Sequence, residues 1–167
     1  AYFNDTFASR LAFQVFEKPA VILSGSWRSS RDEVAAIGNG LRGQLLLLGS
    51  EKDVEGIQRL AGLVDGNAYY WSSVNPATQK KYQERLDAMG GAVHGSGGIW
   101  IPPAAPGFDA RLVGGSSVVD RLDGETLRRE YEVAMGSAPD ALGGISCNEF
   151  SENSHIEPSR EYGTRSL

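Results

Sequence analysis

The densest group of chemically capable side chains lies near the end of the chain. Three carboxylates and one imidazole fall within nine residues, at Glu149, Glu152, His155 and Glu157. Two carboxyl groups held a few ångströms apart repel as anions, so one keeps a proton and serves as an acid while the other serves as a base or nucleophile. Glycoside hydrolysis uses such a pair. Asn148, directly before the group, is suited to hydrogen-bond a sugar hydroxyl.

The spacing of Glu149 and Glu152 restricts where this chemistry is possible. On a straight strand, residues three apart point to opposite faces, because side chains alternate with a period of two. The two carboxyl groups share a cavity only if the strand ends near Glu149 and the chain then turns. The alternative is a solvated loop with helix-capping residues, since Glu-x-x-Glu patterns are common by chance.

A metal or a cofactor is not expected. His155 has carboxylates close in sequence, but the only other histidine is His94, and the one cysteine, Cys147, cannot build a cysteine-rich zinc site. Residues 24–30 form a loop between an expected strand and an expected helix, where the amides at the start of the helix could bind a phosphate. This loop lacks both Gly-rich phosphate-binding patterns, so a flavin- or nucleotide-binding sheet stays a lesser alternative.

Composition and charge argue against other partners. The 167 residues are 41% hydrophobic and 22% charged, and 16 Lys and Arg against 21 Asp and Glu give a net charge of -5. This charge disfavours nucleic acid and anionic membranes as partners. No apolar run approaches the roughly 20 residues that cross a bilayer, and residues 1–5 lack the features of a signal peptide. We expect one domain over residues 1–167.

Short apolar runs alternate with amphipathic stretches, which predicts strands alternating with helices. The strands are expected at 19–25, 44–49, 67–72, 92–101 and 142–147. The helices, with apolar residues three or four apart, are expected at 6–16, 30–37, 53–64, 77–89 and 125–135. The run at 44–49 is apolar on both parities, as in a parallel strand that helices cover on both faces.

Two architectures suit this alternation, because it implies parallel strands with right-handed crossovers. One is an open flavodoxin-like α/β sheet of five units. The other is a TIM (β/α)8 barrel, of which 167 residues hold about the last five units, since a whole barrel needs about 250. The loop at 102–123 is long for a βα connection, and long ordered loops are often functional.

Two segments resemble glycoside hydrolase family 99. Residues 144–158, GISCNEFSENSHIEP, are similar to the last-strand motif of that family and its bacterial relatives, and the family 71 α-1,3-glucanases have a looser version. Residues 100–111, WIPPAAPGFDAR, are similar to the loop after strand seven of the same proteins. The resemblance is strong over residues 92–163. It implies a TIM barrel whose missing N-terminal strands are the partner of this chain.

The resemblance also implies roles for the two glutamates. In family 99 they act on α-mannosides with retention: by motif position, Glu149 deprotonates the sugar 2-hydroxyl to give a 1,2-anhydro intermediate, and Glu152 protonates the leaving oxygen. The implied substrate is an oligosaccharide or polysaccharide, and a secreted or cell-surface location is favoured. Phe150 stands where the family has Trp and Cys147 where it has an aromatic residue, so α-mannan and α-glucan both remain open.

Other residues are candidates for holding the sugar. Trp71 and Trp100 stand near strand ends, where an indole either stacks on a sugar or joins the core. Asp109 and Arg111 either pair with each other or touch substrate. The predicted function is a retaining glycoside hydrolase, and the alternative is a non-catalytic glycan-binding barrel with a decayed site. The full set of candidate substrate-binding residues is Asn148, His155, Trp71, Trp100, Asp109 and Arg111.

Overall fold

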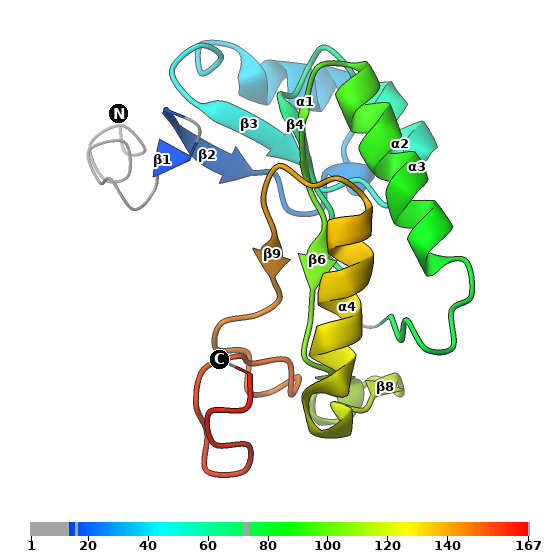
Figure 1. Ribbon diagram of the computed structural model, residues 1–167. Coiled ribbons are helices and arrows are strands. Elements are labelled where there is room, and N and C mark those ends of the chain that lie inside the picture. Colours follow the sequence, from blue (N-terminus) through cyan, green and yellow to red (C-terminus); the bar gives the residue numbers. More distant parts are fainter. Residues whose placement is uncertain (1–13, 16, 72–73, 167) are drawn as a thin grey trace.

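The computed structural model describes residues 14–15, 17–71 and 74–166, and it is an α/β structure built on parallel strands (Figure 1). The main sheet contains β1 (Gln14–Val15), β2 (Lys18–Ile22), β3 (Leu46–Gly49), β4 (Gly66–Ala68) and β5 (Ile99–Ile101). Its strand order is β1-β2-β3-β4-β5. β1 is antiparallel to β2, and all the other pairs are parallel.

The parallel strands continue beyond β5. Pro102 has no N–H to donate and separates β5 from β6 (Pro103–Ala104), which pairs in parallel with β9 (Gly143–Gly144). Neighbouring parallel strands therefore follow one another in chain order from β2 to β9. A flavodoxin-like sheet reverses its order at a switch point, whereas strands in a barrel follow in sequence. The strand order of the described residues rules out the flavodoxin-like alternative.

Four helices connect these strands: α1 (Arg31–Gly38), α2 (Val54–Leu60), α3 (Tyr82–Gly95) and α4 (Glu125–Gly136). Helix α1 begins with a capping box, in which the Ser30 Oγ accepts from the Glu33 N–H and the Glu33 carboxylate accepts from the Ser30 N–H. Asp53 caps α2 by accepting from the Gly56 N–H at 2.8 Å. Figure 1 shows α2, α3 and α4 side by side along the strands, and each packs against the next.

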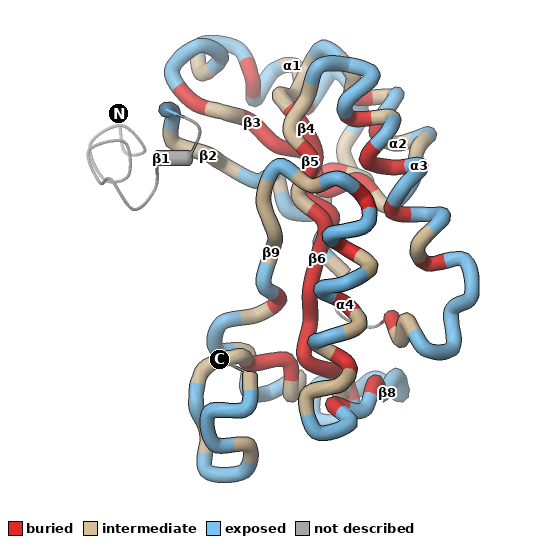
Figure 2. Tube along the Cα trace, in the orientation of Figure 1, coloured by how far each residue is buried: buried red, intermediate tan, exposed pale blue. Residues whose placement is uncertain are grey.

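The main core lies where α3 meets the sheet. In Figure 2 the buried parts of the chain lie along the strands and as separate patches on α3. Leu47 and Leu48 of β3 are both 1% exposed, so both faces of that strand are covered as its sequence predicts. The buried core residues around α3 are Ile57, Tyr69, Val74, Tyr82, Leu86, Met89, Val93 and Trp100.

The strand expected at 92–101 is wrong in its first half. Residues 92–95 form the last turn of α3, and only Ile99–Ile101 is strand. The helix expected at 77–89 is α3, which continues through Gly90 and Gly91. A Cβ atom at Gly90 would lie 2.8 Å from the Ser137 carbonyl oxygen, so the glycine makes room for that contact. This glycine permits close helix packing. The helix ends instead before Gly97, which has a left-handed φ of 73°.

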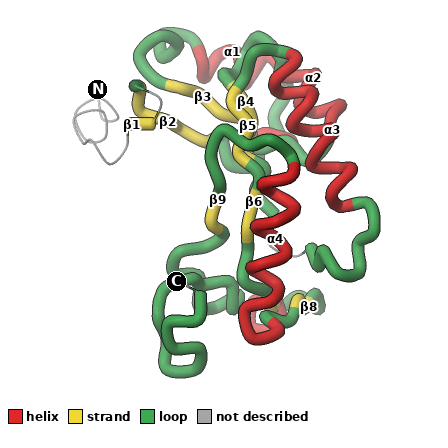
Figure 3. Tube along the Cα trace, in the orientation of Figure 1, coloured by secondary structure: helices red, strands yellow, loops and turns green. Residues whose placement is uncertain are grey.

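Other expected boundaries also shift. Most of the expected helix at 6–16 lies outside the described residues, but Gln14 and Val15 form strand β1 there. The strand expected at 67–72 is the shorter β4, and residue 72 also lies outside. The strand expected at 142–147 is only β9. Figure 3 shows the chain after β9 as loop. No helix among the described residues is both long and apolar enough to span a membrane.

The long loop at 102–123 has structure of its own. After β6 it forms an antiparallel hairpin of β7 (Phe108–Asp109) and β8 (Val118–Val119). Two short 3-10 helices, η4 (Ala110–Val113) and η5 (Leu122–Gly124), complete it and lead into α4. The expectation of an ordered loop at this position is therefore met.

A buried polar network ties the ends of neighbouring strands together. Glu51, directly beyond β3, is 3% exposed, and its carboxylate accepts from the Ser26 hydroxyl at 2.5 Å and from the Arg59 guanidinium at 3.2 Å. Its backbone N–H donates to Asn67 Oδ1 of β4 at 2.7 Å, and the Asn67 amide donates back to the Glu51 carbonyl oxygen. Glu51 thus joins segments that follow or belong to β2, β3, β4 and α2.

A second buried carboxyl group lies between α3 and α4. Glu130 is 0% exposed, its Oε2 accepts from the Tyr82 hydroxyl at 3.3 Å, and its Oε1 has no partner among the described atoms. Burial raises the pKa of Glu130 to about 8. The side chain is therefore mostly protonated at neutral pH.

The pH dependence of stability tests this burial. The pKa of Glu130 is about 8 in the folded chain against 4.5 ordinarily, so the stability it contributes is fully present below pH 4.5 and is lost as the pH rises to about 8. Glu130→Gln removes the titration at nearly equal volume. We measure the free energy of unfolding of both proteins in urea at pH 4 and pH 8. The difference, variant minus wild type, should be a few kcal/mol larger at pH 8 than at pH 4. A difference that stays constant with pH contradicts the assignment.

Removing the Glu51 carboxylate tests the network at the strand ends. Glu51→Ala leaves the Ser26 hydroxyl and the Arg59 guanidinium without their buried acceptor, and we expect the free energy of unfolding to fall by about 2–4 kcal/mol. The matched control is Glu55→Ala, an exposed acid in the first turn of α2, which should cost less than about 1 kcal/mol. Equal losses for the two variants in urea titrations would show that the network adds nothing.

Candidate active site

The carboxyl ends of the parallel strands meet at one edge, where α/β folds carry their ligand sites. The loops at this edge bring together residues that are far apart in sequence. Residues 24–27 follow β2, Glu51 and Lys52 follow β3, and Tyr69 to Trp71 follow β4. The loop that carries Glu149 and Glu152 follows β9 (Figure 1).

Ser146 closes the loop after β9. Its N–H donates to the Ser154 carbonyl oxygen at 2.9 Å, and its own carbonyl oxygen accepts from the Ile156 N–H at 2.9 Å. Its Oγ accepts from the Glu149 N–H at 2.9 Å. The chain therefore leaves and returns at Ser146, with a turn over residues 150–153. Glu149 directly precedes this turn and Glu152 lies within it, so the chain is not extended between the two residues.

The charges of the Glu149 and Glu152 carboxylates both influence Tyr70. Tyr70, just beyond β4, is 49% exposed, and its pKa is raised first by burial and then by the charges of Glu152 and Glu149. The charges of both carboxylates therefore affect one phenol at the carboxyl edge of the sheet. The Ser151 hydroxyl donates to Glu149, and the Glu152 carbonyl oxygen accepts from the Asp109 N–H at 2.7 Å. These bonds fix the loop without an ion pair to either glutamate among the described residues.

Aromatic rings and one cation lie at the same edge. The Lys52 ammonium lies 4.0 Å from the centroid of the Trp27 ring and 4.8 Å from that of Trp71. Trp71 also lies nearly parallel to Tyr69, with centroids 6.4 Å apart. Cation–π contacts of this kind hold rings in place. Trp71 is partly exposed, and its contact with a sugar stays a prediction.

The substrate-binding role expected for Trp100 is wrong. Its side chain is 0% exposed, and its indole N–H donates to the Ser137 Oγ at 2.9 Å. Trp100 is the middle residue of β5 and packs on Gly90 of α3, so neither ring face is open to a ligand. The sequence could not separate the two roles, because a strand end and a strand centre differ by only one or two residues.

Asp109 and Arg111 pair with each other, which is one of the two alternatives their sequence leaves open. The Arg111 Nε lies 2.9 and 3.1 Å from the two Asp109 carboxylate oxygens, and the Arg111 N–H also donates to Oδ1 at 3.0 Å. These bonds lower the pKa of Asp109 to about 2. Their local role is to begin η4. A contact with substrate remains a prediction.

The remaining two candidates lie in different surroundings. Asn148 is exposed beside Glu149. His155 is 5% exposed and stacks on Phe150, with ring centroids 4.2 Å apart. It lines a cavity that neither Glu149 nor Glu152 lines. The structure therefore gathers Glu149, Glu152 and Tyr70 and leaves His155 among other neighbours. No group of three or more His, Cys, Asp or Glu among the described residues is arranged to hold a metal.

Sequence reasoning missed Arg121, which anchors the loop from outside. The Arg121 guanidinium donates to the carbonyl oxygens of His155 at 2.6 Å and Asn153 at 3.2 Å, and it lies 4.2 Å from the Tyr162 ring centroid. Carbonyl acceptors carry no side-chain signature, so no pattern could have predicted these bonds. Tyr70 did carry a signal, because it is an aromatic residue after a strand. The direction of its side chain, however, depends on where β4 ends.

The same fold occurs in larger proteins. No protein-family model matches the chain, and no curated protein matches it. The chain is similar to a solved GH99 endo-alpha-mannosidase from Bacteroides thetaiotaomicron, with a TM-score of 0.78 and 22% identity over 94% of this chain and 50% of that one. The chain is also similar to a second structure of a GH99 endo-alpha-mannosidase from that bacterium, in complex with bis-tris-propane. The TM-score is 0.76 and the identity 22%, over 95% of this chain and 53% of that one. The chain spans about half the length of these structures and shares their fold, which confirms the predicted resemblance at the level of structure.

Proposed function

We propose that this chain is part of a glycoside hydrolase that acts on an α-linked glycan, with Glu149 and Glu152 as its reacting carboxyl groups. One observation carries the proposal: at the carboxyl edge of a parallel sheet, Glu149 directly precedes a closed turn and Glu152 lies within it, so the chain bends between the two carboxylates. Glycoside hydrolysis needs two such groups on one site. The likeness in fold to an endo-alpha-mannosidase supports the same reaction class.

The proposed reaction has two steps with the roles that the family resemblance implies. Glu149 takes the proton of the sugar 2-hydroxyl, whose oxygen attacks C1 while the glycosidic bond breaks and Glu152 gives its proton to the leaving oxygen. Water then attacks C1 of the 1,2-anhydro sugar, Glu152 takes a proton from that water, and Glu149 returns its proton to O2. Two displacements at C1 retain its configuration. We propose that the Tyr70 phenol donates a hydrogen bond to one of these carboxylates when substrate is bound.

The proposed catalytic unit includes more strands than this chain holds. Its parallel strands run in barrel order from β2 to β9, and the matched structures are about twice as long. Among the described residues, β1 pairs with β2 only at Lys18 and Pro19. The rest of that edge of β2 is therefore open to pairing with a further strand. We propose that the rest of a (β/α)8 barrel completes the sheet and supplies the other walls of the site.

A non-catalytic glycan-binding barrel is the second candidate. The observation that favours it is that a cavity of about 820 Å³ beside the loop is lined by neither Glu149 nor Glu152. The two functions differ in whether a product is released. A panel of α-mannans and α-glucans, analysed for new reducing ends, separates a hydrolase from a binding module.

Charge removal tests the two glutamates. Glu149→Gln and Glu152→Gln keep the side-chain volume and abolish proton transfer, so we expect each to lower kcat/KM at least about 100-fold. The assay uses the longest natural polypeptide that contains this sequence. Glu84→Gln, at an exposed acid in the first turn of α3, is the control and should retain full activity. Undiminished hydrolysis in both variants would rule out the assigned roles.

Tyr70→Phe tests the shared phenol. The change removes one hydroxyl near two carboxylates, and losing a hydrogen bond to a charged group lowers kcat/KM by about 10- to 100-fold. The matched control is Tyr131→Phe, since that tyrosine is 51% exposed on α4. If Tyr70→Phe behaves like Tyr131→Phe in the same assay, the phenol plays no part in the reaction.

A further inference from the structure

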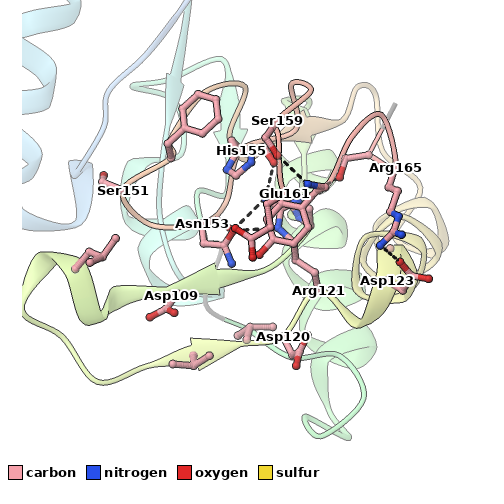
Figure 4. Close-up of a pocket in the computed structure, with 18 of the residues that line it drawn as sticks. Asp109, Asp120, Arg121, Asp123, Ser151, Asn153, His155, Ser159, Glu161 and Arg165 are labelled. Carbon is pink, nitrogen blue, oxygen red and sulfur yellow. Dashed lines mark hydrogen bonds and ion pairs between the residues drawn. The ribbon is translucent and has the colours of Figure 1, made fainter.

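A cavity of about 820 Å³ lies beside the loop after β9, between the β7–β8 hairpin and residues 159–166 (Figure 4). Its volume is within the range of pockets that hold small molecules, about 300–1,000 Å³. Phe150, Ser151, Asn153 and His155 line it, whereas Glu149 and Glu152 do not. One loop therefore carries the two carboxylates and also supplies one wall of this separate cavity.

His155 is the feature of this wall that lacks partners. It is 5% exposed, and neither Nδ1 nor Nε2 has a hydrogen-bond partner among the described atoms. A buried polar atom left without a partner costs about 1–3 kcal/mol. The ring is held between Phe150, at 4.2 Å, and Tyr162, at 5.7 Å between centroids. Burial and then Arg121 lower the pKa of His155, so at neutral pH it offers one donor and one acceptor.

The charges around the cavity are balanced. Its lining carries four arginines, and four acidic side chains oppose them. Asp109 pairs with Arg111 and Asp123 with Arg165, and Figure 4 shows the second pair at the rim. The guanidinium of Arg121, which is 6% exposed, is already engaged by carbonyl oxygens. A neutral ligand rich in hydroxyls suits this lining better than an anion.

We propose that this cavity binds a neutral sugar unit, with His155 hydrogen-bonding to its hydroxyl groups and the Tyr162 and Phe150 rings packing on its apolar face. The inference rests on the proposed function, because the unit belongs to the same glycan whose bond lies at Glu149 and Glu152. The cavity is then a subsite that selects the glycan by a sugar distant from the bond that is cut.

The test uses the two histidines of this sequence, His94 and His155, in the longest natural polypeptide that contains it. With ¹⁵N-labelled histidine, the nitrogen signals of each imidazole are assigned by their loss in the His94→Phe and His155→Phe variants. His94 is the internal control, since it is exposed and bonds to Asp140 at 2.9 Å. The probes are methyl α-mannopyranoside and an α-linked mannotetraose, added to the Glu149→Gln variant so that no hydrolysis is possible. We expect the His155 signals to shift with saturation and the His94 signals to stay.

A substitution gives a second measurement. His155→Phe keeps a ring between Phe150 and Tyr162 and removes both nitrogens, so we expect mannotetraose affinity to fall at least about 10-fold by calorimetry. His94→Phe should leave the affinity unchanged. Should the His155 signals stay fixed at saturating glycan while the wild type hydrolyses it, the subsite is overturned and the proposed function stands. Saturable His155 shifts without any hydrolysis by the wild type would support the subsite and count against the catalytic proposal.

Discussion

The hydrogen bonds of Ser146 are the constraint on which the candidate site depends. This one polar residue, just after β9, returns the chain at Ser154 and holds the backbone of Glu149, so Glu149 precedes and Glu152 lies within a turn of fixed shape. Without that closure, Glu149 and Glu152 would continue an extended strand and diverge to opposite faces. The strand order then places this turn at the edge where Tyr70 leaves β4. Local backbone bonding and sheet topology together bring Glu149, Glu152 and Tyr70 to the same edge of the sheet.

The same loop is held from two sides. Asp109 binds the carbonyl oxygen of Glu152 from the β7–β8 hairpin, and Arg121 binds the carbonyl oxygens of Asn153 and His155. Both anchors come from the long segment between β6 and α4. That segment therefore serves as a support for the turn and as a wall of the cavity beside it. A loop carried on two supports keeps its geometry better than one carried on its own ends.

Sequence reasoning recovers the elements that hydrophobic patterning controls. The leucines of the run at 44–49 are buried on both faces, and the helices expected from residues 30 and 53 begin at Arg31 and Val54. Sequence reasoning fails where packing decides. The helix expected to end at residue 89 continues through Gly90, which makes room for Ser137, and Trp100 was expected to bind substrate but faces the core. The architecture needed the strand order, which periodicity does not contain.

For the candidate site, the spacing of Glu149 and Glu152 predicted a turn, and the structure has one. The surroundings of the turn were beyond prediction, because Arg121 binds carbonyl oxygens more than thirty positions away. The bonds that close the turn join backbone groups and one serine hydroxyl, so the exposed side chain of Cys147 bears little of its architecture. That position is accordingly free to diversify, and a lineage can retune what the pocket accepts without rebuilding the scaffold that presents it.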